Sequence, residues 1–221
     1  MLKQYKDLFD VNETKAKELF LECDHPFEVL PKIKEYIKVL IENLDEDYVE
    51  IKEDVYAHKT ANISETAYIK GPTIIGANTE VRHGAYIRGN AIIGDNCVIG
   101  NSTEVKNAIL FNNAKCPHFN YVGDAILGEY SHIGAGVICS NVKSDNSNIV
   151  VKFEDKKIES GLRKFSVILG SHVEVGCNSV LCPGTIIFRN TNIYPLTRVR
   201  GVIKENKIVK DMNNIVNKES D

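Results

Sequence analysis

A six-residue repeat constrains the fold of this chain more than any other feature of its sequence. From residue 63 a β-branched residue occupies every sixth position for eight repeats: Ile63, Ile69, Ile75, Val81, Ile87, Ile93, Ile99 and Val105. The spacing returns at Leu127, Ile133 and Cys139, and again at Leu169, Val175, Leu181, Ile187, Ile193 and Val199. This period is typical of a parallel β-helix, in which each short strand lies on the equivalent strand of the next coil. A β-sandwich is rejected, because its strands alternate with a period of about two and its turns are spaced by about 8 to 12 residues.

The first 50 residues have a different pattern. Between residues 26 and 43 apolar residues recur at three- and four-residue steps, which predicts one amphipathic helix. A second helix is expected over residues 13 to 21, with Asn12 as its N-cap. We therefore expect a helical appendage at 1–50 that covers the open end of the β-helix, the β-helix itself at 51–205, and a C-terminal tail at 206–221.

Composition excludes several classes of protein. The formal net charge of −3 gives no reason to expect nucleic acid as a partner. No stretch approaches the roughly 20 apolar residues of a membrane span, and the N-terminus carries charges where a signal peptide is apolar, so a cytoplasmic location with no membrane partner is expected. The six cysteines contain no CxxC pair, which favours reduced thiols.

The repeat is interrupted twice, and each interruption is interpreted as a loop that leaves the scaffold. The first covers residues 112 to 124 and contains His118 and Tyr121. The second runs from about 141 to 164, where IVVKFEDKKIES predicts a projecting β-hairpin. Because functional residues gather on loops carried by rigid scaffolds, both segments are candidate parts of a site.

The first interruption carries a specific motif. His118-Phe119-Asn120-Tyr121-Val122-Gly123-Asp124, followed by Ile133-Gly134-Ala135-Gly136 and Asn141, resembles the acetyltransferase domain of bacterial N-acetylglucosamine-1-phosphate uridyltransferases, which are hexapeptide-repeat acyltransferases. The second interruption and the SGLRKFSVILG segment resemble the same domain of archaeal sugar-1-phosphate nucleotidyltransferases. The resemblance covers about residues 55 to 204. It implies an all-β, single-stranded left-handed parallel β-helix with three hexads per coil, and acetyl-CoA-dependent N-acetylation of an amino-sugar 1-phosphate.

The resemblance gives roles to individual residues. It implies that His118 is the general base, and histidine is the side chain whose ordinary pKa suits that role near neutral pH. It also implies that Arg88 and Lys106 hold the sugar phosphate. These two residues are 18 apart and are expected to stack about 4.8 Å from each other, where two cations repel unless an anion bridges them. A pair of solvated surface charges is the alternative.

Further binding residues follow from the same resemblance. Tyr121 is expected to contact the sugar phosphate, Asn141 the amino group and Lys164 the substrate, although the long insertion leaves Lys143 or Lys152 as alternatives to Lys164. Residues 1–54 contain no glycine-rich phosphate loop, so uridyltransferase activity is not expected of this chain.

Two positions depart from the family pattern, and the substrate and cofactor depend on them. His132 stands where the family has a sugar-binding Asn, which keeps galactosamine 1-phosphate as a rival to glucosamine 1-phosphate. Cys177 replaces a family Ser near the CoA, and the Ala135 amide is expected to meet the thioester of acetyl-CoA. Family members are homotrimers with sites between subunits, and a homotrimer is expected here.

Three other functions stay open. A nucleotide-linked amino sugar is an alternative acceptor, and a non-catalytic β-helix scaffold or regulatory subunit is an alternative role. A zinc enzyme related to the γ-type carbonic anhydrases is disfavoured, because none of the six histidines forms the H-x4-H pair of that class. No metal ligand is therefore assigned.

Overall fold

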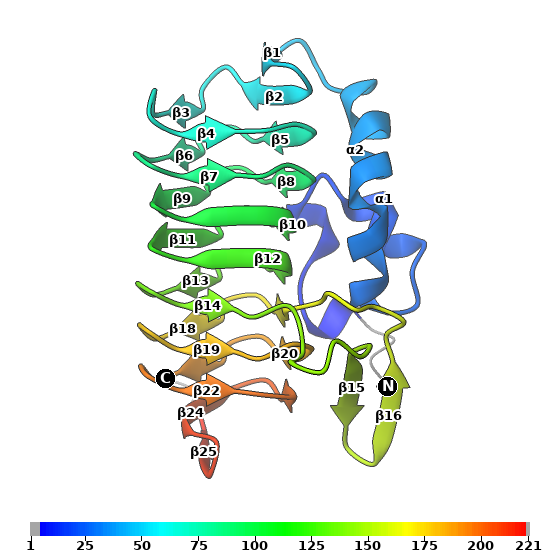
Figure 1. The fold of residues 1–221 in the computed structure, drawn as a ribbon, viewed down its shortest axis with the longest axis vertical. Helices are drawn as coiled ribbons and strands as arrows, with labels where there is room; N and C mark the ends of the chain where they lie inside the picture. Colours follow the sequence, from blue (N-terminus) through cyan, green and yellow to red (C-terminus); the bar gives the residue numbers. More distant parts are fainter. Residues whose placement is uncertain (1–4, 220–221) are drawn as a thin grey trace.

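The computed structural model describes residues 5–219, and its main body is a parallel β-helix with three walls (Figure 1). The first wall contains β4 (Tyr68–Ile69), β7 (Tyr86–Ile87), the first part of β10 (Glu104–Leu110) and of β12 (Tyr121–Leu127), β14 (Ile138–Cys139), β19 (Val180–Leu181) and β22 (Arg198–Val199). The second contains β2 (Val55–His58), β5 (Thr73–Ile75), β8 (Ala91–Ile93), the rest of β10 and β12, β17 (Val167–Leu169), β20 (Thr185–Ile187) and β23 (Val202–Ile203). The third contains β3 (Asn62–Ile63), β6 (Glu80–Val81), β9 (Val98–Asn101), β11 (Lys115–His118), β13 (His132–Ile133), β18 (Glu174–Val175), β21 (Asn192–Ile193) and β24 (Lys207–Asp211).

The interior of the β-helix is filled by the aliphatic residues of the repeat. Ile75, Ile87 and Ile93 are fully buried there, and Ile87 pairs with Val105 of the next coil in the parallel register. Each coil stacks the same kind of side chain on the one before it, so apolar burial continues along the whole axis. The predicted parallel β-helix is confirmed.

The interpretation of residues 112–124 as a loop is wrong. These residues form β11 and the start of β12 and remain within the coils. What changes is the coil length, because Val105 pairs with Ile87, 18 residues earlier, whereas Leu110 pairs with Ile93, 17 residues earlier. The corners at Asn107 and Asp124 are each one residue shorter than the corner at Asn90, so β10 and β12 continue across them as long strands (Figure 1).

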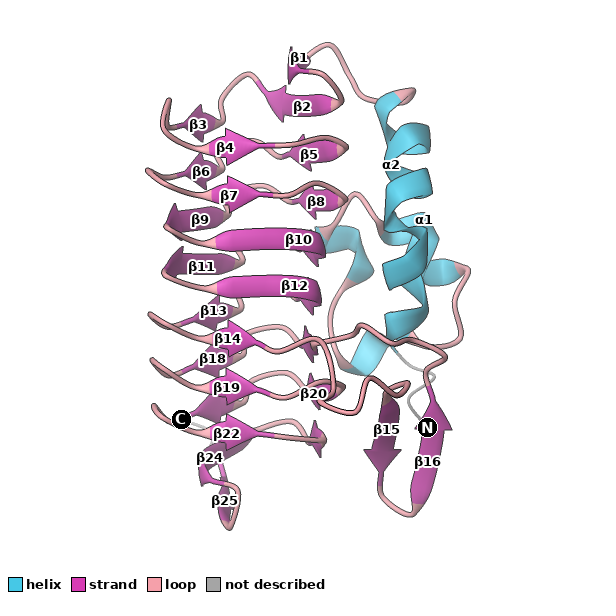
Figure 2. Ribbon diagram, viewed as in Figure 1, coloured by secondary structure: helices cyan, strands magenta, loops and turns pink. Residues whose placement is uncertain are grey.

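The helical segment covers the second wall, not the open end that was expected (Figure 2). It consists of α1 (Lys17–Leu21), α2 (Ile33–Ile41) and three 3-10 helices, η1 (Tyr5–Asp7), η2 (Val11–Glu13) and η3 (Pro26–Lys32). The single helix predicted over 26–43 thus begins as a 3-10 helix, and Asp10, not Asn12, caps the nearby η2 by accepting from the Asn12 N–H. The end of the β-helix carries β1 (Tyr48–Lys52), antiparallel to β2.

A column of outward-facing isoleucines explains why the helices pack on this wall. In the six second-wall strands between β2 and β23, one isoleucine per strand is buried outside the coils: Ile74, Ile92, Ile109, Ile126, Ile168 and Ile186. Phe9 and Phe20 of the helical segment lie against Phe111, with ring centroids 4.6 Å and 5.5 Å away. Helices and isoleucines therefore form a second hydrophobic core beside the interior one.

Two further segments complete the fold, an insertion between β14 and β17 and the C-terminal residues. The predicted hairpin is present as β15 (Val150–Phe153) and antiparallel β16 (Lys156–Glu159), and Ile149 and Val151 are buried in the second core. The chain returns to the coils where the Phe165 N–H donates to the Asn141 carbonyl, at 3.1 Å. Beyond residue 206, the segment expected to be a tail forms β24, parallel to β21, and β25 (Asn214–Asn217), antiparallel to β24.

Candidate functional site

His118 ends β11 at the corner between the third and first walls, here called the His118 corner. Its side chain is exposed, while its backbone is fixed on both sides. The His118 N–H donates to Asn120 Oδ1 at 3.1 Å, and the His118 carbonyl accepts from the Gly136 N–H at 3.0 Å. Asn120 is only 3% exposed and donates through Nδ2 to the Gly134 carbonyl at 2.8 Å. Asn120 thus joins two coils and leaves the imidazole open to solvent.

Three of the sequence-predicted residues share the His118 corner on consecutive coils. The Gly136 N–H binds the His118 carbonyl, and the Asn178 N–H binds the Ala135 carbonyl at 2.8 Å, so His118, Ala135 and Cys177 form one column. The Cys177 side chain is exposed. The Ala135 N–H makes no hydrogen bond to another residue of the described chain, so a ligand oxygen can use it.

Tyr121 begins β12 on the first wall, and its ring lies over Gly123. A Cβ atom at Gly123 would stand 2.4 Å from the Tyr121 hydroxyl oxygen, so only glycine leaves room for the ring. The hydroxyl accepts from Asn141 Nδ2 at 3.1 Å. Burial raises the pKa of Tyr121, and the nearby carboxylates of Asp124 and Glu104 add to this effect. The phenol is therefore a neutral hydrogen-bonding group at ordinary pH.

Asp124 connects the binding residues of the first wall. It lies at the shortened corner between the first and second walls and is 4% exposed. Its Oδ2 accepts from Lys106 Nζ at 3.2 Å and from Asn141 Nδ2 at 2.5 Å, and its Oδ1 accepts from Asn107 Nδ2 at 2.9 Å. Asp124 thus joins Lys106 to Asn141, and Asn141 in turn bonds the Tyr121 hydroxyl, so three residues that the resemblance assigns to one site are connected.

Arg88 lies one coil before Lys106 on the same wall, as the spacing predicted, since the Arg88 N–H donates to the Val105 carbonyl. The two cations do not depend on a bound anion to offset their repulsion, however, because each has its own carboxylate. Arg88 Nη1 lies 2.7 Å from Glu104 Oε1, and Lys106 is paired with Asp124. The Arg88 pair is partly exposed, so it is weak enough for a bound anion to replace Glu104.

His132 and Lys164 lie at the margins of this arrangement. His132 is on the third wall, where its Nδ1 lies 2.8 Å from Glu174 Oε2, its partner in the next coil. Lys164 is exposed and borders a cavity of 390 Å³ that reaches Asn107 and Asp124 and is walled by Leu30 and Pro31 of η3. Its position next to Asp124 fits a binding role. The alternative Lys143 pairs with Asp145 at 3.5 Å within the insertion.

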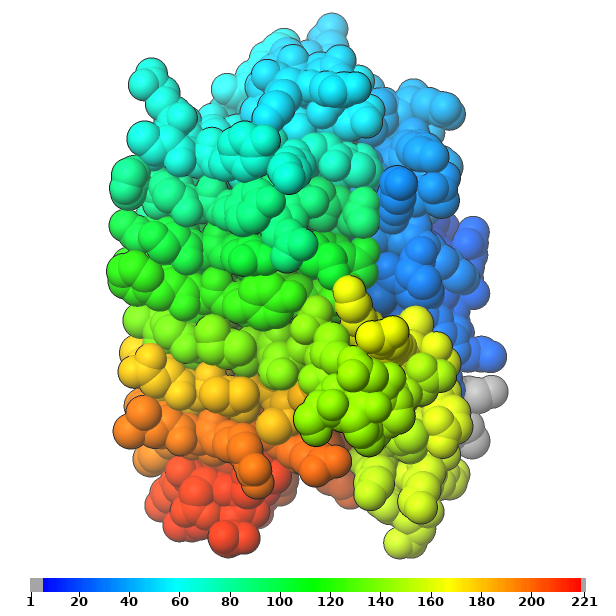
Figure 3. Space-filling model, viewed as in Figure 1, coloured from blue at the N-terminus to red at the C-terminus, as the bar shows by residue number. Residues whose placement is uncertain are grey.

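Two cavities lie near the C-terminal coils, and both are rich in cations. The larger one, 890 Å³, separates the insertion from the last coils and is lined by Lys143, Lys152, Arg198, Arg200 and one carboxylate, Asp145, among others. In Figure 3 the insertion, in yellow-green, lies beside the orange coils that form the opposite side.

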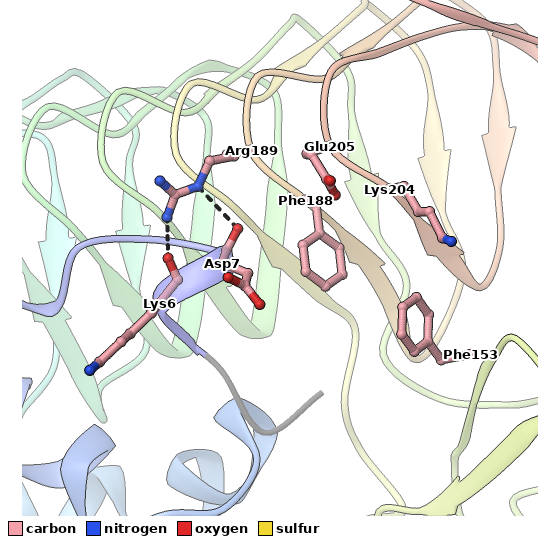
Figure 4. Close-up of a pocket in the computed structure, with 7 residues that line it drawn as sticks. All are labelled: Lys6, Asp7, Phe153, Phe188, Arg189, Lys204 and Glu205. Atoms are coloured by element: carbon pink, nitrogen blue, oxygen red, sulfur yellow. Dashed lines mark hydrogen bonds between the residues drawn. The ribbon is translucent and has the colours of Figure 1, made fainter. Parts of the chain in front are cut away.

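The second cavity, 450 Å³, lies between η1, the hairpin and the last coils (Figure 4). Its cations are engaged within the protein: Arg189 Nε donates to the Asp7 carbonyl at 3.0 Å, and Lys204 pairs with Glu154 at 2.8 Å. The rings of Phe153 and Phe188 are stacked, with centroids 6.1 Å apart. Of the two cavities, the larger one has the cations that are more available to an anionic ligand.

Two further structural observations concern possible functions. Over residues 5–219, no cluster of three or more His, Cys, Asp or Glu side chains is arranged to hold a metal ion. In the same range, no helix has the length and apolar character needed to cross a bilayer.

Asn120, Asp124 and Glu104 had no role assigned from the sequence, although the first two are inside the quoted motif. The signal was present, because a polar residue at a position that the repeat buries needs hydrogen-bond partners from neighbouring coils. Asn120 and Asp124 find theirs in His118, Gly134, Lys106 and Asn141. Glu104 carries no such signal, since it is a partly exposed residue whose partner comes from another coil.

Known proteins and one protein family have sequences similar to this chain. The model of the GMPPB C-terminal domain matches residues 69–209. A bifunctional sugar-1-phosphate nucleotidylyltransferase/acetyltransferase of Sulfurisphaera tokodaii is 37% identical over 159 residues, which are 64% of this chain and 40% of that protein. The bifunctional protein GlmU of Methanocaldococcus jannaschii is 31% identical over 150 residues, 68% of this chain and 32% of that protein. The chain therefore spans less than half the length of these relatives.

Solved structures with similar coils have lower identity. A hexapeptide transferase family protein from Anaplasma phagocytophilum is 14% identical with a TM-score of 0.36, over 73% of this chain and 80% of that one. A point mutant of AntD, an N-acyltransferase from Bacillus cereus, is 15% identical with a TM-score of 0.42, over 80% and 91% of the two chains.

Proposed function

The chain belongs to the family of GMPPB C-terminal domains, and from this premise we propose that it is an acetyl-CoA-dependent N-acetyltransferase of an amino-sugar 1-phosphate. Glucosamine 1-phosphate is the acceptor that we propose first. The observation that carries the proposal is the grouping of the motif residues. Asp124 accepts from Lys106 and Asn141, Asn141 also donates to the Tyr121 hydroxyl, and His118 and Ala135 lie at the adjoining corner.

The proposed reaction moves an acetyl group from sulfur to nitrogen. The amine of the sugar attacks the thioester carbon, the C–N bond forms, and His118 takes the proton that the nitrogen loses. The free Ala135 N–H stabilises the negative charge that develops on the thioester oxygen. The C–S bond then breaks, and the thiolate of CoA leaves and is protonated. Such a general base contributes about 10² to 10⁴ in rate.

The sugar phosphate is proposed to bind Arg88 and Lys106, with the Tyr121 hydroxyl beside them. Their present partners, Glu104 and Asp124, reduce the positive charge that the phosphate meets. We place Asn141 at the amino group and Lys164 at the rim. His132 is bound to Glu174 on the third wall, so its contribution to the sugar site is the least supported of the assigned residues.

CoA is proposed to extend from the His118 corner, past Ala135 and Cys177, toward the C-terminal coils. The larger cavity supports this, because Arg198 and Arg200 lie there without a carboxylate partner among the described residues. Arg198 is in register with Val180, Val180 with Ile138 in the same column, and Ile138 with Tyr121. Three strand spacings, about 14 Å, separate Tyr121 from these cations, which suits phosphates at the end of a long arm.

A homotrimer with sites between subunits is part of the proposal. Phe119, which follows His118, is 60% exposed, and Leu196, three coils further along the same column of corners, is 78% exposed. Large apolar side chains so exposed beside a candidate site suit a surface that a second copy covers.

One observation favours a nucleotide-linked amino sugar as a second candidate acceptor. Lys70 lies one coil before Arg88 and has no carboxylate partner within residues 5–219. Its Nζ is 5.7 Å from the ring centroids of both Tyr68 and Tyr86. A cation between aromatic rings offers a surface for a second phosphate and a base.

The experiment is a thiol-release assay with acetyl-CoA and a panel of acceptors: glucosamine 1-phosphate, galactosamine 1-phosphate and amino sugars linked to a nucleoside diphosphate. We expect thiol release that depends on a sugar 1-phosphate, with N-acetylated product by mass spectrometry. Thiol release only with nucleotide-linked sugars would show that the acceptor is the second candidate and not a sugar 1-phosphate. Silence with every acceptor, from protein with intact β-structure by circular dichroism, would contradict the enzymatic role.

A further inference from the structure

We propose that Asp124 is a positioning residue of the acetyl transfer, whose buried carboxylate holds Lys106 and Asn141 in the orientation that meets the substrate. The inference rests on the proposed function for its kinetic consequences. Its structural content, a carboxylate that fixes the donors around Tyr121, can be tested without any substrate.

Within residues 5–219, every hydrogen-bond donor to the Asp124 carboxylate lies in or beside the candidate site. A carboxylate that is 4% exposed is costly to bury unless hydrogen bonds compensate for the lost water. The three donors are Lys106 and Asn107 from the preceding coil and Asn141 from the next one. Because a carboxylate accepts and never donates, each of these side chains must turn a donor toward it.

The Asp124 carboxylate also decides how Asn141 is oriented. Asn141 Nδ2 donates both to Asp124 Oδ2 and to the Tyr121 hydroxyl, at 2.5 Å and 3.1 Å. Nδ2 of Asn141 is thus used by Asp124 and Tyr121, which leaves Oδ1 to accept from the N–H of an amino sugar. With no carboxylate at position 124, the amide would be free to rotate and present the wrong group.

The backbone holds Asp124 rigidly. Its φ is +51°, a conformation that Asp and Asn tolerate better than most residues, and it lies at a shortened corner. Its carbonyl accepts from both the N–H and the hydroxyl of Ser166, at 2.9 Å and 3.1 Å. The carboxylate is therefore placed by the scaffold, independently of the substrate.

The kinetic test compares Asp124→Ala, Asp124→Asn and Asp95→Ala. Asp95 is the matched control, because its carboxylate accepts from the Ala77 N–H at 2.8 Å at a different corner. We expect Asp124→Ala to lower kcat/KM for the amino-sugar 1-phosphate about 10- to 100-fold. Losses of this size are typical when a residue that orients a binding group is removed. KM for acetyl-CoA should stay unchanged.

The conservative variant separates positioning from folding. In Asp124→Asn the side-chain amide oxygen can still accept from Lys106 and Asn141, so this variant should recover most of the kcat/KM that Asp124→Ala loses. Wild-type kinetics in Asp124→Ala, or equal losses in Asp124→Ala and Asp95→Ala that follow their melting temperatures, would overturn the inference.

A titration of Tyr121 tests the same contact without turnover. Burial is the largest cause of the raised pKa of Tyr121, and the charges of Asp124 and Glu104 raise it further against Arg88, so Asp124→Asn should lower that pKa. The phenol is followed by ultraviolet absorbance, as the difference between each protein and the same protein with Tyr121→Phe. An unchanged pKa would overturn the positioning role. If the pKa falls but the protein acetylates no tested sugar, the contacts of Asp124 with the site stand and the proposed substrate is rejected.

Discussion

At the scale of residues, the motif around His118 has two kinds of members. His118 and Tyr121 present chemical groups, whereas Asn120, Gly123 and Asp124 hold them in place through buried contacts between coils. The first kind could be proposed from the sequence because the motif resembles that of a known family, whose roles transfer by residue type. The second kind depends on which residues a neighbouring coil brings close, and that is a property of the register.

The contact between Tyr121 and Gly123 gives a prediction at this scale. Gly123→Ala places a Cβ atom 2.4 Å from the present position of the Tyr121 hydroxyl, so the ring must move and its bond to Asn141 is lost. One lost hydrogen bond of this kind corresponds to roughly a five- to tenfold increase in KM for the sugar phosphate. Steady-state kinetics measure it, with Tyr121→Phe as the variant that removes the hydroxyl alone. An unchanged KM in Gly123→Ala would show that the ring position does not matter.

The pair between Arg88 and Glu104 gives a second prediction. Glu104→Gln removes the charge that competes with a bound phosphate, so we expect a lower KM for the sugar 1-phosphate, by roughly two- to fivefold, with little change in stability. The effect should shrink as salt concentration rises, because the pair is partly exposed. Kinetics at two ionic strengths check this, and a raised KM would indicate that Glu104 itself binds the substrate.

At the scale of elements, the repeat predicted the coils but not what covers them. The outward isoleucines, such as Ile92 and Ile109, occur once per coil and mark the second wall as the face that needs a covering layer. Their signal is in the sequence, because they directly precede an interior residue of the repeat. The prediction that the helices cap the open end was wrong for this reason. Their apolar face packs on the outward isoleucines along the side of the β-helix.

The second core gives a prediction about stability. Phe20 is fully buried between Phe9 and Phe111, so Phe20→Ala should lower the free energy of unfolding by about 3 to 5 kcal/mol. Leu21→Ala, next in sequence but 47% exposed, should change it by less than about 1 kcal/mol. Denaturant unfolding followed by circular dichroism measures both. Equal effects would mean that the helical segment does not stabilise the coils.

At the scale of the whole molecule, the regular scaffold makes its irregularities informative. The parallel β-helix could be predicted from the repeat, because aliphatic residues at six-residue spacing fill the interior of such coils, whereas the coil length was implied by the resemblance. A coil shortened from 18 to 17 residues could not be distinguished from a projecting loop, because each of them breaks the six-residue pattern. In the stacked coils, the shortened corners at Asn107 and Asp124 bring these two residues into contact beside Lys106.

Assembly is also a property of the whole molecule. The proposed homotrimer predicts the mass of three chains in sedimentation equilibrium. Phe119→Asp together with Leu196→Asp should shift the protein toward monomers and lower the acetylation rate, since both large apolar side chains are more than half exposed along the edge of the β-helix that carries His118. A wild-type monomer with full activity would contradict sites between subunits.

The role of His118 as the base of an acetyl transfer is tested by kcat for acetylation of glucosamine 1-phosphate, compared between wild-type protein and His118→Ala. Loss of the base should lower kcat by about 10² to 10⁴, with similar KM values for both substrates. His58→Ala changes a partly exposed histidine that is bonded to Thr60 in a distant coil, so it should keep the wild-type rate. A His118→Ala variant that acetylates the sugar at the wild-type rate would rule out His118 as the base.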